Sequence, residues 1–392
     1  MSTSERQFNT PASTTWPAML DWSPQAPLLV PDSLVPSTAR VSGMTERTAE
    51  EVVRRLLFMT GRAARLGQYC APFCFKSAYS AMALLEDVSQ DNRDQIVRDC
   101  LGPMPKSAHT SARTGSSYAE NHQIYDAYFG LARVAALSPA ELTVVTVPVL
   151  KNMIAELAQR PLPHDDLVAL LTFGTRLLDV SIGSAVGGCD IKLLPIPNEG
   201  AGGVAALRRW KVGHQVYALA NRAAARELSS AAEYIRDDQP DLAIATLYQV
   251  AKHVRALTAA MELAAAMPAE HYVNVVRPSM AEPVLPIELA GAMNLDHAAY
   301  RSAMADFLPL LPPHRELIRH APKLADARDA VLHADLIDLE RHICLTYRLV
   351  GASAALDENE RGSAVMALRG RYLSRVAAYA PLIRLGQILM TR

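Results

Sequence analysis

Residues 334–351 read Ala-Asp-Leu-Ile-Asp-Leu-Glu-Arg-His-Ile-Cys-Leu-Thr-Tyr-Arg-Leu-Val-Gly, the pattern of an amphipathic helix that ends at a glycine. Its apolar positions recur with helical spacing on two neighbouring stripes: Leu336, Leu339, Ile343 and Val350 on the first, and His342, Leu345 and Leu349 on the second. Gly351 suits the left-handed conformation that commonly ends a helix. The stretch therefore predicts a rigid helix that carries one histidine, His342, among apolar side chains.

The chain around this helix predicts the same structural class. From Val204 onward it is rich in alanine, leucine, arginine and glutamate, all strong helix formers. Helical periods occur at 205–236, 239–266, 297–309, 313–332, 334–350 and 363–389, and no Walker-type or GxGxxG loop is present. We predict an all-α helical bundle with three parts: an extended arm at 1–45, an N-terminal helical region at 46–203 and a second helical region at 204–392. A short hairpin or loop is expected within 180–203.

Composition limits the kinds of partner. The formal net charge is −1 over 392 residues, so no basic field for nucleic acid exists. No apolar run approaches a membrane span, and the first residues lack a signal pattern. Five cysteines, an odd number, argue against a disulfide scaffold. We expect a cytoplasmic protein without a nucleic-acid or membrane partner.

Two further stretches precede the His342 helix. The first is Arg209-Trp210-Lys211-Val212-Gly213-His214, with Tyr217 three residues later; the second runs from Met267-Pro268 through Tyr272 to Arg277-Pro278-Ser279, with Asp296-His297 downstream. After the helix come a Gly-Ser segment with Ser363 and a Leu-Arg element with Arg369. In this order, the stretches resemble the tryptophan 2,3-dioxygenase superfamily of haem-dependent aromatic oxygenases. They are most similar to its 3-methyl-L-tyrosine and L-tyrosine hydroxylases, over approximately residues 204–375.

The resemblance implies a bundle that encloses a haem. His342 would be the proximal iron ligand, a role that suits an imidazole on a rigid helix with apolar neighbours. Trp210 and Arg369 would contact the cofactor, and His297 is a candidate second axial ligand, a question that stays open. In the hydroxylases a cysteine four residues after the proximal histidine bonds covalently to the haem. Here Thr346 stands at that position, so we predict non-covalent haem b.

The same resemblance assigns the substrate site. His214 would be catalytic, accepting or relaying a proton from a phenol or indole or polarising bound oxygen. Arg277 would bind the substrate carboxylate, for which its planar, permanently charged guanidinium is well suited. Tyr217 and Ser363 are the remaining substrate-binding candidates. The expected partners are an aromatic amino acid, O2 or hydrogen peroxide as oxidant, and a second copy of the chain in a homodimer.

The sequence therefore predicts a haem-dependent oxygenase that hydroxylates the ring of an L-tyrosine-like amino acid in secondary metabolism. One alternative is a dioxygenase that opens an indole ring, and another is an enzyme that rearranges the ring of a tryptophan derivative. A third alternative, from a different class, is a helical haem-binding protein without turnover. The spectral response of the haem to L-tyrosine and L-tryptophan would discriminate among them.

Overall fold

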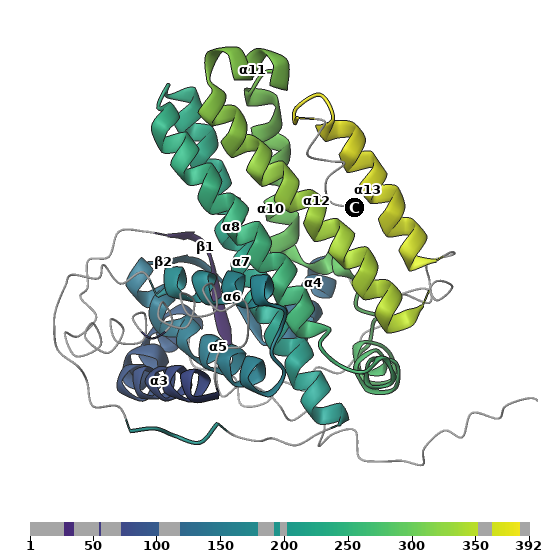
Figure 1. The fold of residues 1–392 in the computed structure, drawn as a ribbon. Coiled ribbons are helices and arrows are strands. Elements are labelled where there is room, and N and C mark those ends of the chain that lie inside the picture. The colour runs from purple at the N-terminus through teal and green to yellow at the C-terminus, as the bar shows by residue number, and fades with distance from the viewer. Residues whose placement is uncertain are drawn as a thin grey trace, which may run out of the picture.

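The computed structural model describes residues 27–34, 55, 72–101, 118–178, 192–196, 202–351 and 363–384. These residues are mostly helical (Figure 1), which confirms the predicted all-α fold class. The α-helices are α3 (Pro72–Leu101), α4 (Tyr118–Phe129), α5 (Pro139–Gln159), α6 (His164–Leu177), α7 (Gly203–Arg236), α8 (Pro240–Ala264), α9 (Ala269–His271), α10 (Leu295–Phe307), α11 (His314–His320), α12 (Pro322–Val350) and α13 (Ala364–Tyr379). The short turns are a π-helix η1 (Tyr272–Val276) and the 3-10 helices η2 (Pro278–Met280), η3 (Gly291–Met293) and η4 (Leu308–Leu310).

The long helices α7, α8 and α12 form the centre of a bundle, with α10 against α7 and α13 against α12 (Figure 1). α7 and α8 approach closely because α7 carries small residues on its buried face. A Cβ atom built at Gly213 would lie 2.5 Å from the Cβ of Ala264 on α8, so the contact requires glycine at that position. α12 ends at Gly351, whose φ of 81° is the left-handed conformation that the sequence predicted.

Two strands pair in parallel beside the bundle, and neither was predicted. β1 (Leu28–Leu34) aligns Leu28 with Leu131 of β2 (Leu131–Leu137), and α5 and α7 pack against β1. β1 falls within the predicted arm and β2 within a region predicted as helical. Periodicity along one sequence does not reveal the pairing of two segments that lie far apart in the chain. One hydrophobic core extends from Leu28 to Ile383, so it includes residues from each of the three predicted parts.

The helix boundaries at the end of the chain need one correction. The predicted division at residue 333 is wrong, because α12 is continuous from Pro322 and the break comes earlier, at Ala321. Proline disfavours a helical conformation in the residue before it, but is well tolerated in the first turn of a helix. The predicted helix 363–389 corresponds to α13 but extends too far, because α13 ends at Tyr379 and residues 380–384 are not helical; residues 385–392 lie outside the described part of the chain. Most of 180–203, where a hairpin or loop was expected, also lies outside it, and residues 192–196 are irregular.

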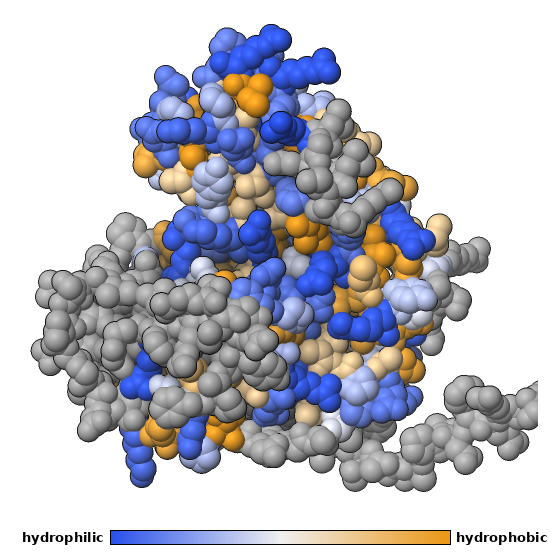
Figure 2. All heavy atoms as spheres, in the orientation of Figure 1, coloured by the Kyte–Doolittle hydropathy of each residue, from blue (hydrophilic) through white to orange (hydrophobic). Residues whose placement is uncertain are grey.

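The surface of the described residues mixes polar and apolar side chains (Figure 2). The most exposed large apolar side chains are those of Tyr347, Met366 and Leu373 near the end of α12 and on α13. No helix among the described residues combines the length and the apolar character needed to cross a bilayer.

Candidate active site

His342 lies in the C-terminal third of α12, and its side chain is half-buried. Neither of its ring nitrogens has a hydrogen-bond partner among the described residues. Burial, followed by the charges of Arg371 and Arg375, lowers the pKa of His342 to about 4. The ring is therefore neutral near pH 7, and a lone pair on one nitrogen is available to bind a ligand.

The neighbouring Arg341 faces away from this ring and fixes the helix. Its guanidinium pairs with Asp166 of α6 at 2.7 Å and with Glu262 of α8 at 3.5 Å. Because adjacent helical residues lie about 100° apart, these ion pairs anchor one side of α12 while His342 occupies another. The position of His342 is thus set by α6 and α8 as well as by its own helix.

His214 is held between two aromatic side chains. Its ring stacks on Phe129 of α4 with centroids 4.3 Å apart and planes at 11°, and Trp210 lies 4.3 Å away on another side. The Nδ1 atom of His214 is 2.8 Å from the carbonyl oxygen of Trp210. A carbonyl can only accept, so Nδ1 carries the proton and Nε2 carries the lone pair. Burial lowers the pKa of His214 to about 4, with a further decrease from the charge of His342.

His297 lies in the first turn of α10 and faces α7. Its Nδ1 atom shares a hydrogen bond of 3.2 Å with the hydroxyl of Tyr217, and its backbone N–H donates to the side chain of Asn294 at 2.9 Å. Burial lowers the pKa of His297 to about 4, and the charges of Arg375, Arg301 and His342 contribute to the shift. Burial also raises the pKa of Tyr217, so its hydroxyl stays protonated.

The five side chains proposed from α7, α10 and α12 share one environment. Trp210, His214, Tyr217, His297 and His342 are all half-buried, although burial strongly depresses the pKa of each of the three histidines. His342 acts electrostatically on both His214 and His297, and the ring of Tyr217 lies 6.5 Å from His214 and 6.2 Å from His297. The three histidines therefore form one cluster, to which α7, α10 and α12 each contribute one ring.

Arg277 lies between η1 and η2, and its backbone N–H donates to the carbonyl of Tyr272 at 2.8 Å. Within the described residues its half-buried guanidinium has no hydrogen-bond or ion-pair partner. Its charge acts on Tyr272, whose pKa burial raises to about 12. Tyr272 contacts Trp210 edge to face at 5.4 Å, and Trp210 contacts His214, so Arg277 is connected to His214 through these two rings. The guanidinium is therefore free to bind an anion.

The remaining predicted residues lie on or just before α13. Ser363 is the residue before the first turn of α13 and is half-buried, whereas Arg369 is exposed. The arginines on this helix whose charges act on His342 are Arg371 and Arg375. Arg375 also pairs with Asp335 of α12 at 3.2 Å, which ties this cation to the helix that carries His342.

Two buried acids on the same face of α12 as His342 were not predicted. Asp335 accepts hydrogen bonds from Tyr300, Arg301, Arg375 and Tyr379 at 2.7–3.2 Å, and so joins α10, α12 and α13. Burial alone would raise the pKa of Asp335, but Arg375 and Arg301 hold it below its ordinary value. Asp338 accepts from Thr258 at 3.0 Å, and burial, followed by Asp335, raises its pKa to about 7. The spacing of 335, 338 and 342 places all three side chains on one helical face, a sequence signal that would have identified both acids.

The residues around His342 and His214 fit a haem. His342 supplies an unpartnered neutral imidazole, and the buried Nε1–H of Trp210 has no acceptor among the described residues, which is costly unless a ligand supplies one. Cations for acidic groups are present at Arg277 and Arg375. A separate apolar cluster supplies the walls: Ala206, Ala265, Met267, Tyr272, Val276, Leu345 and Leu349, with Trp210 and Met280 packed against it.

The side chains near His342 on α12 show whether a cysteine lies where it could bond covalently to a haem. Thr346, one turn after His342, is buried, whereas the thiol-bearing Cys344 is exposed. A side chain two positions from His342 lies on a nearly opposite side of the helix. No cysteine of the described residues of α12 therefore accompanies His342 on its face.

Comparisons with known proteins were consistent with the sequence resemblance. The family model of the SfmD 3-methyl-L-tyrosine peroxygenases matches residues 61–329 of this chain. The matched residues include Trp210, His214, Arg277 and His297, while His342 lies beyond them. No curated protein matches the chain. Among solved structures, the crystal structure of reduced SfmD soaked with sodium hydrosulfite is 18% identical, with a TM-score of 0.41, and the match covers 80% of this chain and 98% of that chain.

Proposed function

The chain belongs to the SfmD 3-methyl-L-tyrosine peroxygenase family, and from that premise we propose that it is a haem-dependent enzyme that hydroxylates the aromatic ring of an L-tyrosine-like amino acid in secondary metabolism. Membership of a peroxygenase family makes the chain an oxidoreductase, and the family predicted from the sequence is confirmed. The homodimer and the cytoplasmic location remain predictions.

One observation carries the proposal: His214, His297 and His342 come from three different helices and are all kept neutral by burial. Neutral imidazole is the form that binds iron and accepts protons. His342, which has no protein partner, is the proposed proximal ligand of haem b. When the Nδ1–H of His297 donates to the Tyr217 hydroxyl oxygen, the lone pair on Nε2 of His297 stays available as a second ligand of the iron. Trp210 and the cations Arg375 and Arg369 are proposed to bind the polar groups of the cofactor.

When bound, haem would supply the activation of the oxidant and the transfer of one oxygen atom to the ring. The family name favours hydrogen peroxide as oxidant, in the balanced reaction of an aromatic C–H with H2O2 to give C–OH and water. Dioxygen with a reductant is the alternative. The stacking of His214 on Phe129 and its tilted contact with Trp210 hold its imidazole in one orientation.

The protein side chains would then bind and orient the substrate. Arg277 would bind the carboxylate through two parallel N–H···O bonds, because no protein carboxylate competes for it within the described residues. His214 would accept the phenolic proton at Nε2, since its Nδ1–H is already donated to Trp210. Tyr217 and Ser363 are the proposed further contacts to the substrate. Exclusion of water by the apolar cluster around Tyr272 would strengthen each of these polar interactions.

The test begins with the absorption spectrum of the purified protein after incubation with haemin. We expect a Soret band whose absorbance corresponds to one haem per chain. This band should shift on addition of L-tyrosine or 3-methyl-L-tyrosine. Hydrogen peroxide should then add one oxygen atom to the ligand, as seen by mass spectrometry, and acidified organic solvent should extract the haem. A protein that binds no haem, or whose Soret band responds to L-tryptophan alone, would refute the proposal.

A further inference from the structure

One face of α4 is bonded to the irregular segment that joins α8 to α10, residues 265–294. Three side chains on this face make the contacts: the Nδ1–H of His122 donates to the Met293 carbonyl at 2.7 Å, the hydroxyl of Tyr125 accepts from the Asn294 amide at 3.0 Å, and the hydroxyl of Tyr128 bonds to Ser279 Oγ at 2.6 Å. The spacing of three residues aligns them along the helix. α4 therefore holds both the middle and the end of the segment.

The contact at Ser279 concerns Arg277 directly. Ser279 is fully buried, and its hydroxyl donates to the carbonyl of Val276 at 2.6 Å. Since that hydroxyl has one proton, its oxygen must accept the hydrogen bond from Tyr128. Val276 and Ser279 lie on either side of Arg277, so the Tyr128 hydroxyl is connected to the turn that presents the guanidinium.

The ring of Tyr128 is itself held in place. Phe129 contacts it edge to face with centroids 4.8 Å apart, and the ammonium of Lys211 lies 4.7 Å from its centroid. Phe129 also stacks on His214. The end of α4 thus contacts both the proposed proton acceptor and the turn of the proposed carboxylate ligand.

We propose that Tyr128 is a positioning residue that acts through Ser279 to hold Arg277 at the distance from His214 that an aromatic amino acid requires. This inference rests on the proposed function, because it assumes that Arg277 binds a carboxylate. The carboxylate and the ring of such a substrate are joined by only two carbon atoms, so their separation falls within a narrow range. The two protein groups that bind these ends must therefore be held at a set distance from each other by one rigid element. α4 contacts both the ring of His214 and the turn that carries Arg277.

The test compares two ligands on the haem-loaded protein by calorimetry: L-tyrosine, and tyramine, which lacks the carboxylate. Tyr128→Phe and Ser279→Ala each remove one partner of the buried hydrogen bond. Each should weaken L-tyrosine binding about three- to tenfold, the usual value of one such bond, and leave the affinity for tyramine unchanged. In an Arg277→Ala background, Tyr128→Phe should add nothing. The thermal unfolding midpoint serves to show that the fold is retained.

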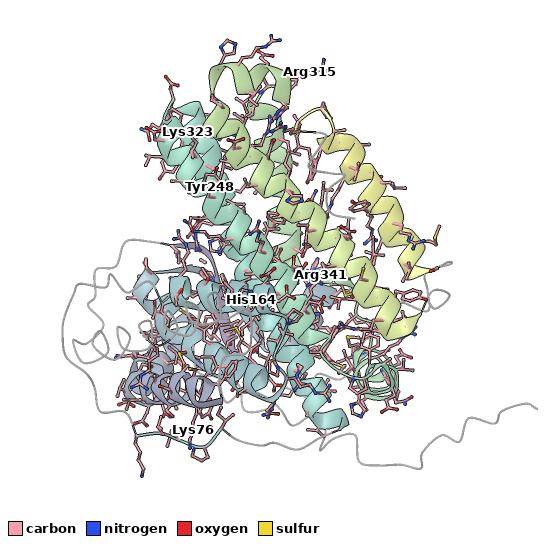
Figure 3. The ribbon with its side chains drawn as sticks, in the orientation of Figure 1. Lys76, His164, Tyr248, Arg315, Lys323 and Arg341 are labelled. Atoms are coloured by element: carbon pink, nitrogen blue, oxygen red, sulfur yellow. The ribbon has the colours of Figure 1, made fainter. Side chains whose placement is uncertain are left out.

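Two tyrosines provide matched controls. Tyr125→Phe removes a buried hydroxyl from the same helix but at the Asn294 contact, and Tyr248→Phe removes an exposed one on α8 (Figure 3). Neither should change the ratio of the two affinities. An equal loss for both ligands in Tyr128→Phe and Ser279→Ala, or no loss, would overturn the positioning role while Arg277→Ala still weakens L-tyrosine binding. If Arg277→Ala itself has no effect, the proposed substrate role fails, and the positioning role fails with it.

Discussion

α12 and the segment of residues 265–294 hold the proposed groups of one site by different means. α12 is a continuous helix whose His342 is placed by backbone hydrogen bonds and by ion pairs to α6 and α8. The segment consists of short turns whose middle is bonded to α4 through Tyr128 and Ser279, the contact that we propose positions Arg277. A repeated pattern of backbone hydrogen bonds holds α12, whereas single hydrogen bonds hold the segment. Haem binding by α12 should therefore tolerate substitutions nearby that substrate binding by the segment does not.

The largest effect is expected on the amount of haem that the protein binds. His342→Ala removes the proposed axial ligand and should abolish stoichiometric haem binding, measured as the Soret absorbance per chain after reconstitution. His333→Ala, on the same helix, serves as the control and should keep a full complement of haem. Haem bound at one per chain in His342→Ala would show that α12 does not supply the ligand.

The next effect concerns turnover. His214→Gln keeps a side chain of similar size but removes the basic nitrogen, so kcat should fall about 10²- to 10⁴-fold, the usual contribution of a general acid–base group. Haem content and L-tyrosine affinity should change little. Steady-state kinetics with peroxide measures the loss. An unchanged kcat would mean that the phenolic proton leaves by another route.

A smaller effect is expected on substrate binding. Arg277→Ala loses charge-assisted hydrogen bonds worth about 1.5–3 kcal/mol, so L-tyrosine should bind roughly 10- to 150-fold more weakly. Haem content should be unaffected, because the change lies in the segment and not on α12. Arg319→Ala, an exposed arginine on α11, is the control. Loss of haem in Arg277→Ala would remove the contrast between the two regions.

The smallest effect is one of pH. The folded chain lowers the pKa of His297 from 6.5 to about 4, so its contribution to stability is complete above about pH 6.5 and is lost as the pH falls towards 4. Partial accessibility reduces the full value of the shift, and we expect about 1–2 kcal/mol for this ring. Urea unfolding of the haem-free protein across this range should show a shallower pH dependence for His297→Gln. Arg277→Gln should leave the pH dependence of the unfolding free energy unchanged. The same pH dependence in His297→Gln and Arg277→Gln would contradict the prediction.

The sequence predicted the regular part of this molecule better than its irregular part. The periodicity around His342 and His214 predicted the helices that carry them, since a buried stripe repeats along a helix. The pairing of β1 with β2 and the contacts of Tyr128 and Tyr125 depend on residues far apart in the chain, and no local pattern encodes them. The break at Ala321 was misplaced although Pro322 marked it. Among the α13 arginines, the sequence could not distinguish exposed Arg369 from Arg375, which pairs with Asp335.

The contact between Gly213 and Ala264 has a practical consequence for protein engineering. Any side chain at 213 would collide with α8, so α7 cannot turn about its axis to present His214 or Trp210 differently. Saturation libraries aimed at a new ligand range should leave this helix pair untouched and concentrate on residues 276–280. There the backbone is held by individual hydrogen bonds, and a single replacement can redirect a side chain without loss of the bundle.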